Sequence, residues 1–90
     1  MKSVRWTAHA LKNLADREVD RAQADLALAQ PEFVTSGQPP RRIFMRRYFD
    51  TQLQQEVLLC LIVEETPDEL VVVTVYRTSQ VARYLKGVQP

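Results

Sequence analysis

The first third of the chain has apolar residues at helical spacing. After Thr7 they recur every three or four positions, at Ala8, Leu11, Leu14 and Ala15. Threonine is a favoured N-cap residue, so this segment predicts an amphipathic helix that begins after Thr7. Asp20 is a plausible cap for a second helix, which is expected to end at Gln30 because Pro31 disfavours the α conformation of the residue before it.

The remaining two thirds favour strands. Residues 33–35 form a short apolar stretch before a loop with a double proline, and residues 41–49 are rich in aromatic and branched side chains. Residues 56–64 are apolar on both faces, which predicts a central strand that is covered on both sides. A short polar turn joins them to the β-branched run at residues 69–77, so these two runs predict an antiparallel hairpin.

The chain closes with a helical pattern. Ser79 is a candidate cap, apolar residues follow at helical spacing, and Gly87 is a natural helix end. The order of elements predicts an α+β fold, in which an N-terminal two-helix layer packs on a three- to four-stranded antiparallel sheet and a short C-terminal helix follows. With 90 residues, the chain is expected to form a single domain, residues 1–90.

Composition excludes several classes of site. The chain has 2 glycines, 1 cysteine and 1 histidine, and its formal net charge is +1. This leaves no Gly-rich phosphate loop and no Cys/His zinc site within one chain, so no metal and no cofactor are expected. Cys60 lies in an apolar run and is expected to be a buried strand residue. The chain shows no secretion signal and no membrane-spanning stretch, which favours a cytoplasmic protein of bacterial type with no membrane partner.

Charge is unevenly distributed along the chain. Residues 31–50 hold four arginines and two acidic residues, whereas residues 51–69 hold five acidic residues and neither Lys nor Arg. If residues 41–49 are extended, one face carries Arg42, Phe44, Arg46 and Tyr48, and the other face carries Arg41, Ile43, Met45, Arg47 and Phe49.

This arginine-rich strand is the strongest binding candidate. Arginines interleaved with aromatic side chains suit phosphate contacts and base stacking, so the predicted RNA-binding residues are Arg41, Arg42, Arg46, Arg47 and Tyr48. The alternative is a solvated edge strand whose charges discourage edge-to-edge association. Arginine, rather than lysine, presents a planar fork that matches phosphate oxygens.

His9 is the candidate acid or base. An imidazole titrates near neutral pH, but a single histidine on the first turn of a helix is also an ordinary surface residue. Arg17 lies slightly more than two helical turns further on and shares a face with His9 if the helix extends that far. Strict alternation along residues 69–77 places Tyr76 on the face of Leu70, Val72 and Thr74.

These residues resemble a known family. The opening "TAHALKNLADREV", the "QPEFV" segment, the arginine-bearing strand and the closing "VVVTVYR" are similar to a bacterial domain of unknown function, number four-two-five-eight. That family is usually placed near the RelE and ParE toxins. The resemblance implies two helices on an antiparallel sheet and marks His9, Arg17 and the Arg41/Arg42 pair. This chain has Glu18 where a glycine often follows the arginine.

Two functions remain open from the sequence. The first is a RelE-like toxin that cuts RNA without metal, with His9, Arg17, Arg42 and Tyr76 as the catalytic set; such a toxin is expected to have a cognate antitoxin-like partner. The second is a non-catalytic binding module that recognises RNA or an acidic partner protein. A homodimer formed through apolar strands is a third arrangement.

Overall fold

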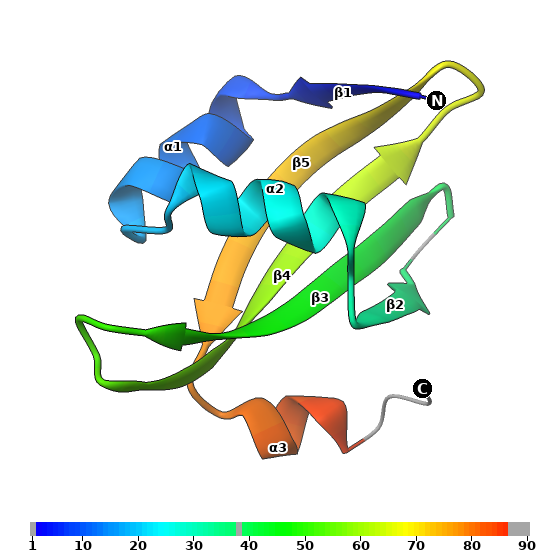
Figure 1. Ribbon diagram of the computed structural model, residues 1–90. Helices are drawn as coiled ribbons and strands as arrows, with labels where there is room; N and C mark the ends of the chain where they lie inside the picture. Colours follow the sequence, from blue (N-terminus) through cyan, green and yellow to red (C-terminus); the bar gives the residue numbers. More distant parts are fainter. Residues whose placement is uncertain (1, 38, 87–90) are drawn as a thin grey trace.

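The computed structural model describes residues 2–37 and 39–86 and confirms the α+β class. The strands are β1 (Ser3–Trp6), β2 (Phe33–Ser36), β3 (Arg41–Asp50), β4 (Gln55–Glu65) and β5 (Glu69–Thr78). The helices are α1 (Ala8–Asp16), α2 (Arg21–Ala29) and α3 (Val81–Leu85). Figure 1 shows α2 crossing in front of the sheet, α1 beside β5, and α3 apart from both.

The sheet differs from the expected one in size and direction. It has five strands in the order β1-β5-β4-β3-β2, and β1 pairs in parallel with β5, whereas the other neighbours are antiparallel. The prediction of three to four antiparallel strands, with helices at the N-terminus, is therefore wrong in these respects. The missed strand precedes α1 and has four residues, too few for an apolar alternation to stand out.

Both long helices begin after the capping residues that the sequence predicts. Thr7 accepts a hydrogen bond from the Ala10 N–H, and Asp20 accepts one from the Ala22 N–H. The expected cap of the third helix is wrong, because Gln80 occupies that position and its side chain makes no capping bond. Gly87, the expected end of that helix, lies outside the described residues.

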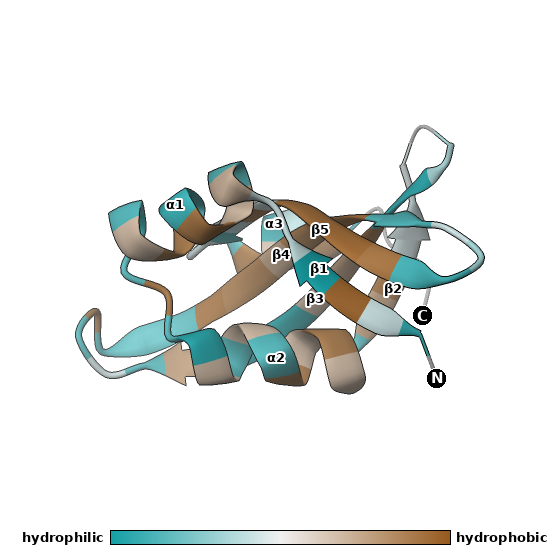
Figure 2. Cartoon of the chain, turned by 90° about the horizontal axis from the view of Figure 1, so that it is seen from above, coloured by the Kyte–Doolittle hydropathy of each residue, from teal (hydrophilic) through white to brown (hydrophobic). Residues whose placement is uncertain are grey.

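Two apolar clusters hold the layers together. The larger lies between the sheet and helices α1 and α2, and it includes Leu59, Leu61 and Val63 of β4. The smaller lies on the other face, where Leu58 and Cys60 of β4 pack against Val81 and Leu85 of α3. The expected central strand, covered on both sides, is confirmed, and Figure 2 shows β4 and β5 as the hydrophobic centre with hydrophilic turns at their ends.

A β-bulge in β5 changes the face of the sheet on which the side chains after it lie. Ile62 pairs with Thr74 but Val63 pairs with Val72, so Val73 is an extra residue in β5. Leu70 and Val72 pack in the helix-side cluster, whereas Tyr76 packs in the α3-side cluster. The expectation that Tyr76 shares a face with Leu70 and Val72 is therefore wrong, because the bulge shifts the alternation by one residue.

Candidate functional site: an apolar groove beside α2

His9 and Arg17 occupy opposite ends of α1. His9 is exposed in the first turn, and in the part of the chain that the structure describes no hydrogen bond or ion pair reaches its ring. Arg17 is the exposed C-cap residue. The helical rise between the two positions is about 12 Å, so their side chains do not share a site.

Tyr76 lies on the other side of the sheet from the α1 and α2 layer. Its ring centroid is 6.4 Å from that of Tyr84, and it packs against the cluster that contains Cys60. Burial, together with the neighbouring Cys60, raises the pKa of the Tyr76 hydroxyl to about 12. The structure therefore does not bring Tyr76 together with His9.

The arginines of β3 divide between the two faces of the sheet. Phe44 and Tyr48 belong to the helix-side cluster and Met45 to the other, so Arg42 and Arg46 alternate onto the helix side and Arg41 and Arg47 onto the opposite side. The face assignment made from the sequence is thus confirmed. The four guanidinium groups do not form one continuous surface.

Most of these guanidinium groups also have partners within the chain. Arg47 forms two side-chain hydrogen bonds to Glu32, at 3.1 and 3.0 Å, and these bonds, together with one from the Arg47 backbone N–H, lower the pKa of Glu32. Arg46 donates to the Gln30 carbonyl oxygen at the end of α2, 2.6 Å away. Arg42 pairs with Glu65 at 2.9 Å, and Arg41 approaches Glu64 at 4.0 Å.

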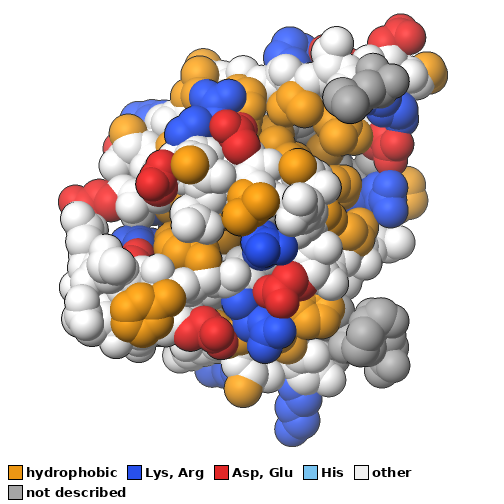
Figure 3. Space-filling model, in the orientation of Figure 1, with side chains coloured by type: hydrophobic (Ala, Val, Ile, Leu, Met, Phe, Trp, Pro, Cys, Tyr) orange, Lys and Arg blue, Asp and Glu red, His pale blue; other side chains and the backbone are white. Residues whose placement is uncertain are grey.

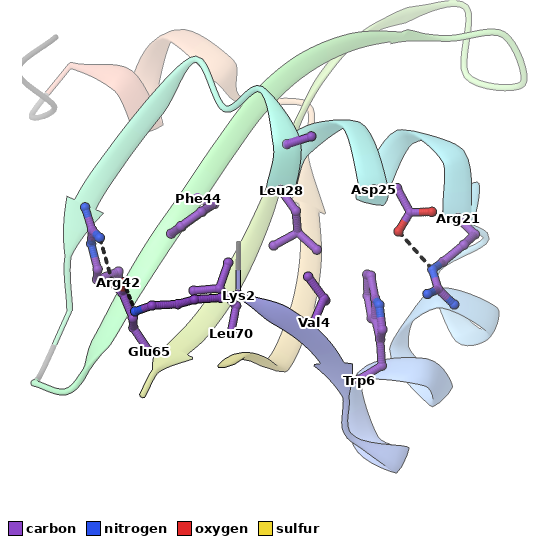
Figure 4. A pocket seen from close by; sticks show the side chains of 11 residues that line it. Lys2, Val4, Trp6, Arg21, Asp25, Leu28, Arg42, Phe44, Glu65 and Leu70 are labelled. Atoms are coloured by element: carbon purple, nitrogen blue, oxygen red, sulfur yellow. Dashed lines mark hydrogen bonds and ion pairs between the residues drawn. The ribbon is translucent and has the colours of Figure 1, made fainter. Parts of the chain in front are cut away.

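A hollow in this surface lies between α2 and the strands β1, β5, β4 and β3. We call it the α2 groove; its volume is about 670 Å³, and its lining residues are Lys2, Val4, Trp6, Arg21, Asp25, Leu28, Ala29, Arg42, Phe44, Glu65 and Leu70. Figure 4 shows their side chains converging from α2 on one side and β1 on the other. Figure 3 shows hydrophobic side chains gathered on this face of the molecule, with basic and acidic side chains around them.

Charged groups mark both ends of the α2 groove (Figure 4). At one end Lys2 and Arg42 share the single carboxylate of Glu65, at 2.5 and 2.9 Å, and their hydrogen bonds and positive charges lower its pKa. At the other end the Arg21 guanidinium lies 4.2 Å from the centre of the Trp6 ring and pairs with Asp25 at 3.2 Å.

The lining is mainly apolar, with charged side chains at its ends. Among the described residues it includes no His, Cys, Ser, Thr or Tyr. In the described part of the chain no three His, Cys, Asp or Glu residues are placed to hold a metal ion. Within the same residues no helix is long and apolar enough to cross a bilayer.

The sequence carries one weak signal for this groove. Val4 and Trp6 alternate with polar neighbours and Trp6 is the single tryptophan, but so short a pattern does not establish a strand. The alternation of residues 41–49 places Arg42 and Phe44 on one face, and both of these residues line the groove. The groove also needs β1 beside β5, and that parallel pairing joins residues that are far apart in the sequence.

Comparisons with known proteins give one result. Searches of curated proteins and of solved structures found no match. A family model described as "Domain of unknown function (DUF4258)" matches residues 6–77, which include Trp6, α2 and the groove-lining residues of β3, β4 and β5. The chain therefore belongs to the DUF4258 family.

Proposed function

We propose that this domain is a non-catalytic binding module that recognises an acidic, partly apolar segment of a partner protein through the α2 groove. The observation that carries the proposal is the lining of that groove, an apolar floor bounded by three basic side chains and two acidic ones. A concave, mainly apolar site with a few polar groups is the common form of a ligand site.

The apolar floor makes binding of an apolar segment favourable. Val4 is 45% exposed, and Leu28 and Leu70 are partly buried beside it, so an occupant removes apolar surface from water. Such burial is favourable by about 25 cal/mol for each Å² of apolar surface. The groove also has a volume within the range of about 300–1,000 Å³ that is usual for ligand sites.

The positive charge at one end of the groove favours an acidic partner. Two cations, Lys2 and Arg42, face one carboxylate, that of Glu65, so this cluster keeps one net positive charge and unused N–H donors. An aspartate or glutamate of the partner can accept hydrogen bonds from those donors, and bonds between charged groups are the stronger kind.

An acidic protein segment has more support than RNA. Arg47 is bound to Glu32, Arg46 to the end of α2, and Arg41 faces the other side of the sheet. RNA binding by this strand would require several of these contacts to break. RNA cleavage by a RelE- or ParE-like toxin would use His9, Arg17, Arg42 and Tyr76. His9 and Arg17 lie at opposite ends of α1, Arg42 lies at the α2 groove, and Tyr76 lies on the other side of the sheet.

The test is a selection of peptide ligands. A displayed library of random peptides is panned against the full chain, and binding of the selected peptides is followed through the fluorescence of Trp6, the single tryptophan. We expect the selected sequences to combine apolar residues with Asp or Glu, and their binding to change the Trp6 emission. Val4→Glu should weaken binding at least about tenfold, because it places a charge on the apolar floor.

Leu53→Glu is the matched control. Leu53 is 47% exposed in the turn between β3 and β4 and does not line the groove, so this substitution introduces the same charge outside it. Equal loss of binding in both variants, or none in either, would contradict the proposal. The wild type and His9→Ala are also incubated with structured RNA in EDTA; cleavage that disappears in His9→Ala would favour the ribonuclease instead.

A further inference from the structure

We infer that the segment bound in the α2 groove is a short amphipathic helix, which lies beside α2 as a further helix of the same layer. This inference rests on the proposed function and names the shape of its ligand. It follows from the extent of the groove, from the residues of its α2 wall and from the charge at its ends.

The groove extends both across and along the strands. Its lining residues come from β3, β4, β5 and from β1 with the residue before it, which are four consecutive positions in the sheet. Neighbouring strands are about 4.8 Å apart, so the groove extends about 14 Å across the strands. Lys2, Val4 and Trp6 also line it along β1, over about 13 Å. A floor of this width and length has room for a helix, which is about 10–12 Å in diameter with its side chains.

The wall of the groove is one stripe of α2. Arg21, Asp25, Leu28 and Ala29 follow one another at intervals of four, three and one residues, so they lie along the same side of the helix. The stripe is about 12 Å long, which matches a partner helix of two to three turns.

The sheet beside α2 is open to a second helix. Ala24 and Ala27 are fully buried, so these small residues let α2 lie close to the strands. The floor beyond α2 consists of Val4, Leu70 and Phe44, with Leu28 at its side. In Figure 4 these four side chains lie between the two charged ends, where the apolar stripe of a docked helix would rest.

The charged ends define the polar residues of the partner. An acidic side chain is placed beside Lys2 and Arg42, where one positive charge is left after pairing with Glu65. The other end, where Arg21 pairs with Asp25, is balanced and requires no charge. A partner helix therefore needs three or four apolar residues on one side and an acidic residue at one end of that stripe.

The periodicity of the selected peptides tests this inference. The peptides of about 12 residues that bind the full chain should repeat apolar residues at intervals of three and four, and their helical circular dichroism should increase on binding. Apolar residues at alternate positions, with no gain of helicity, would show a bound strand and overturn the inference while leaving the proposed function intact.

The acidic residue is tested by a double-mutant cycle. The Asp or Glu of a selected peptide is changed to Asn or Gln, and Arg42→Gln is made in the chain; each change alone should weaken binding about three- to tenfold. If the residues interact, the two changes together should weaken binding less than the product of the separate effects. Independent effects would show that Arg42 does not contact the acidic residue of the peptide, and would overturn this placement of the helix.

Arg41→Gln is the matched control for this cycle. Arg41 is the neighbouring arginine on the opposite face of the sheet, so the same substitution there should leave the affinity of the peptide unchanged. If Arg41→Gln weakens binding as much as Arg42→Gln, the effect comes from net charge and the proposed position of the helix is wrong.

Discussion

The buried side chain of Asn13 joins α1 to the edge of β5 by accepting a hydrogen bond from the Val75 backbone N–H. The distance from Oδ1 to that nitrogen is 3.1 Å, and Asn13 is 6% exposed. β1 pairs with β5 as far as Val72, so α1 covers the next part of the same edge. Asn13 thereby satisfies a backbone donor that would otherwise be unpaired in the interior.

Asn13→Ala should destabilise the protein by about 1–3 kcal/mol, because it leaves the Val75 N–H without an acceptor. The free energy of unfolding in urea measures this change. Leu11→Ala, on the exposed side of the same helix, should change it by less than about 0.5 kcal/mol. Equal stability of Asn13→Ala and the wild type would show that the hydrogen bond contributes nothing.

Asp50 links the turn after β3 to the end of β5. One carboxylate oxygen accepts hydrogen bonds from the Gln52 and Leu53 N–H groups, at 2.9 and 3.0 Å, and the other accepts one from Arg77. The side chains of Asp50 and Arg77 are 8% and 17% exposed, which makes this pair the most buried among the ion pairs of the described residues.

Asp50→Ala should therefore cost about 2–3 kcal/mol of stability, since it removes the turn contacts and leaves Arg77 without its partner. Lys12→Ala is a suitable comparison. It breaks the exposed Lys12–Asp16 pair and should cost less than about 1 kcal/mol. Urea unfolding of both variants measures this difference in stability. Similar losses of stability would show that the burial of the Asp50–Arg77 pair does not increase its contribution.

The sequence predicts the local elements of this fold better than their pairing. Thr7 and Asp20 identify helix starts because a cap acts within a few residues, and the apolar run of β4 identifies a central strand for a similar reason. The parallel pairing of β1 with β5 depends on residues more than sixty positions apart. No local pattern reports such a contact.

The candidate site shows the same limit. Alternation correctly places Arg42 and Phe44 on one face, but it fails for Tyr76 because the bulge at Val73 has no clear signature among consecutive β-branched residues. A count of charges selects the arginine strand as a surface, yet Glu32, Glu64 and Glu65 lie close enough to pair with it only once the sheet is formed. The groove depends on this same assembly.

Glu18 occupies a backbone conformation that favours glycine. Its φ is 53°, and the N–H groups of Glu18 and Val19 bond back to Ala15 and Leu14 at the end of α1. A residue with a Cβ is strained in this left-handed conformation. Glycine is the usual residue at this position after a helix.

Glu18→Gly should stabilise the protein by about 0.5–1 kcal/mol, since the relief of strain exceeds the entropy that glycine adds to the unfolded chain. Glu18→Ala tests the cause, because alanine removes the charge and keeps the Cβ; it should give little or no gain. Thermal unfolding of the three proteins measures the order. A gain in the alanine variant equal to that in the glycine variant would assign the effect to charge.

Cys60 and Tyr76 should make the protein less stable at alkaline pH. Burial raises the pKa of the Cys60 thiol from 9.0 to about 11, and that of the Tyr76 hydroxyl from 10.0 to about 12. The folded state thus binds both protons more tightly than the unfolded state does. Stability is complete below about pH 9, where both groups are protonated in both states, and it falls as pH rises toward 11 because only the unfolded state can readily ionise.

Urea unfolding at pH 8, 9, 10 and 11, a range that brackets the unfolded-state pKa values of both groups, measures the loss, which for Cys60 is on the order of 2 kcal/mol. Cys60→Ala leaves a small cavity and lowers stability at every pH, so the quantity to compare is the slope between pH 9 and 11. That slope should be smaller in Cys60→Ala, and Tyr76→Phe should reduce the part above pH 10. Slopes equal to that of the wild type in both variants would assign the alkaline loss to other groups, since neither buried proton would then be linked to folding.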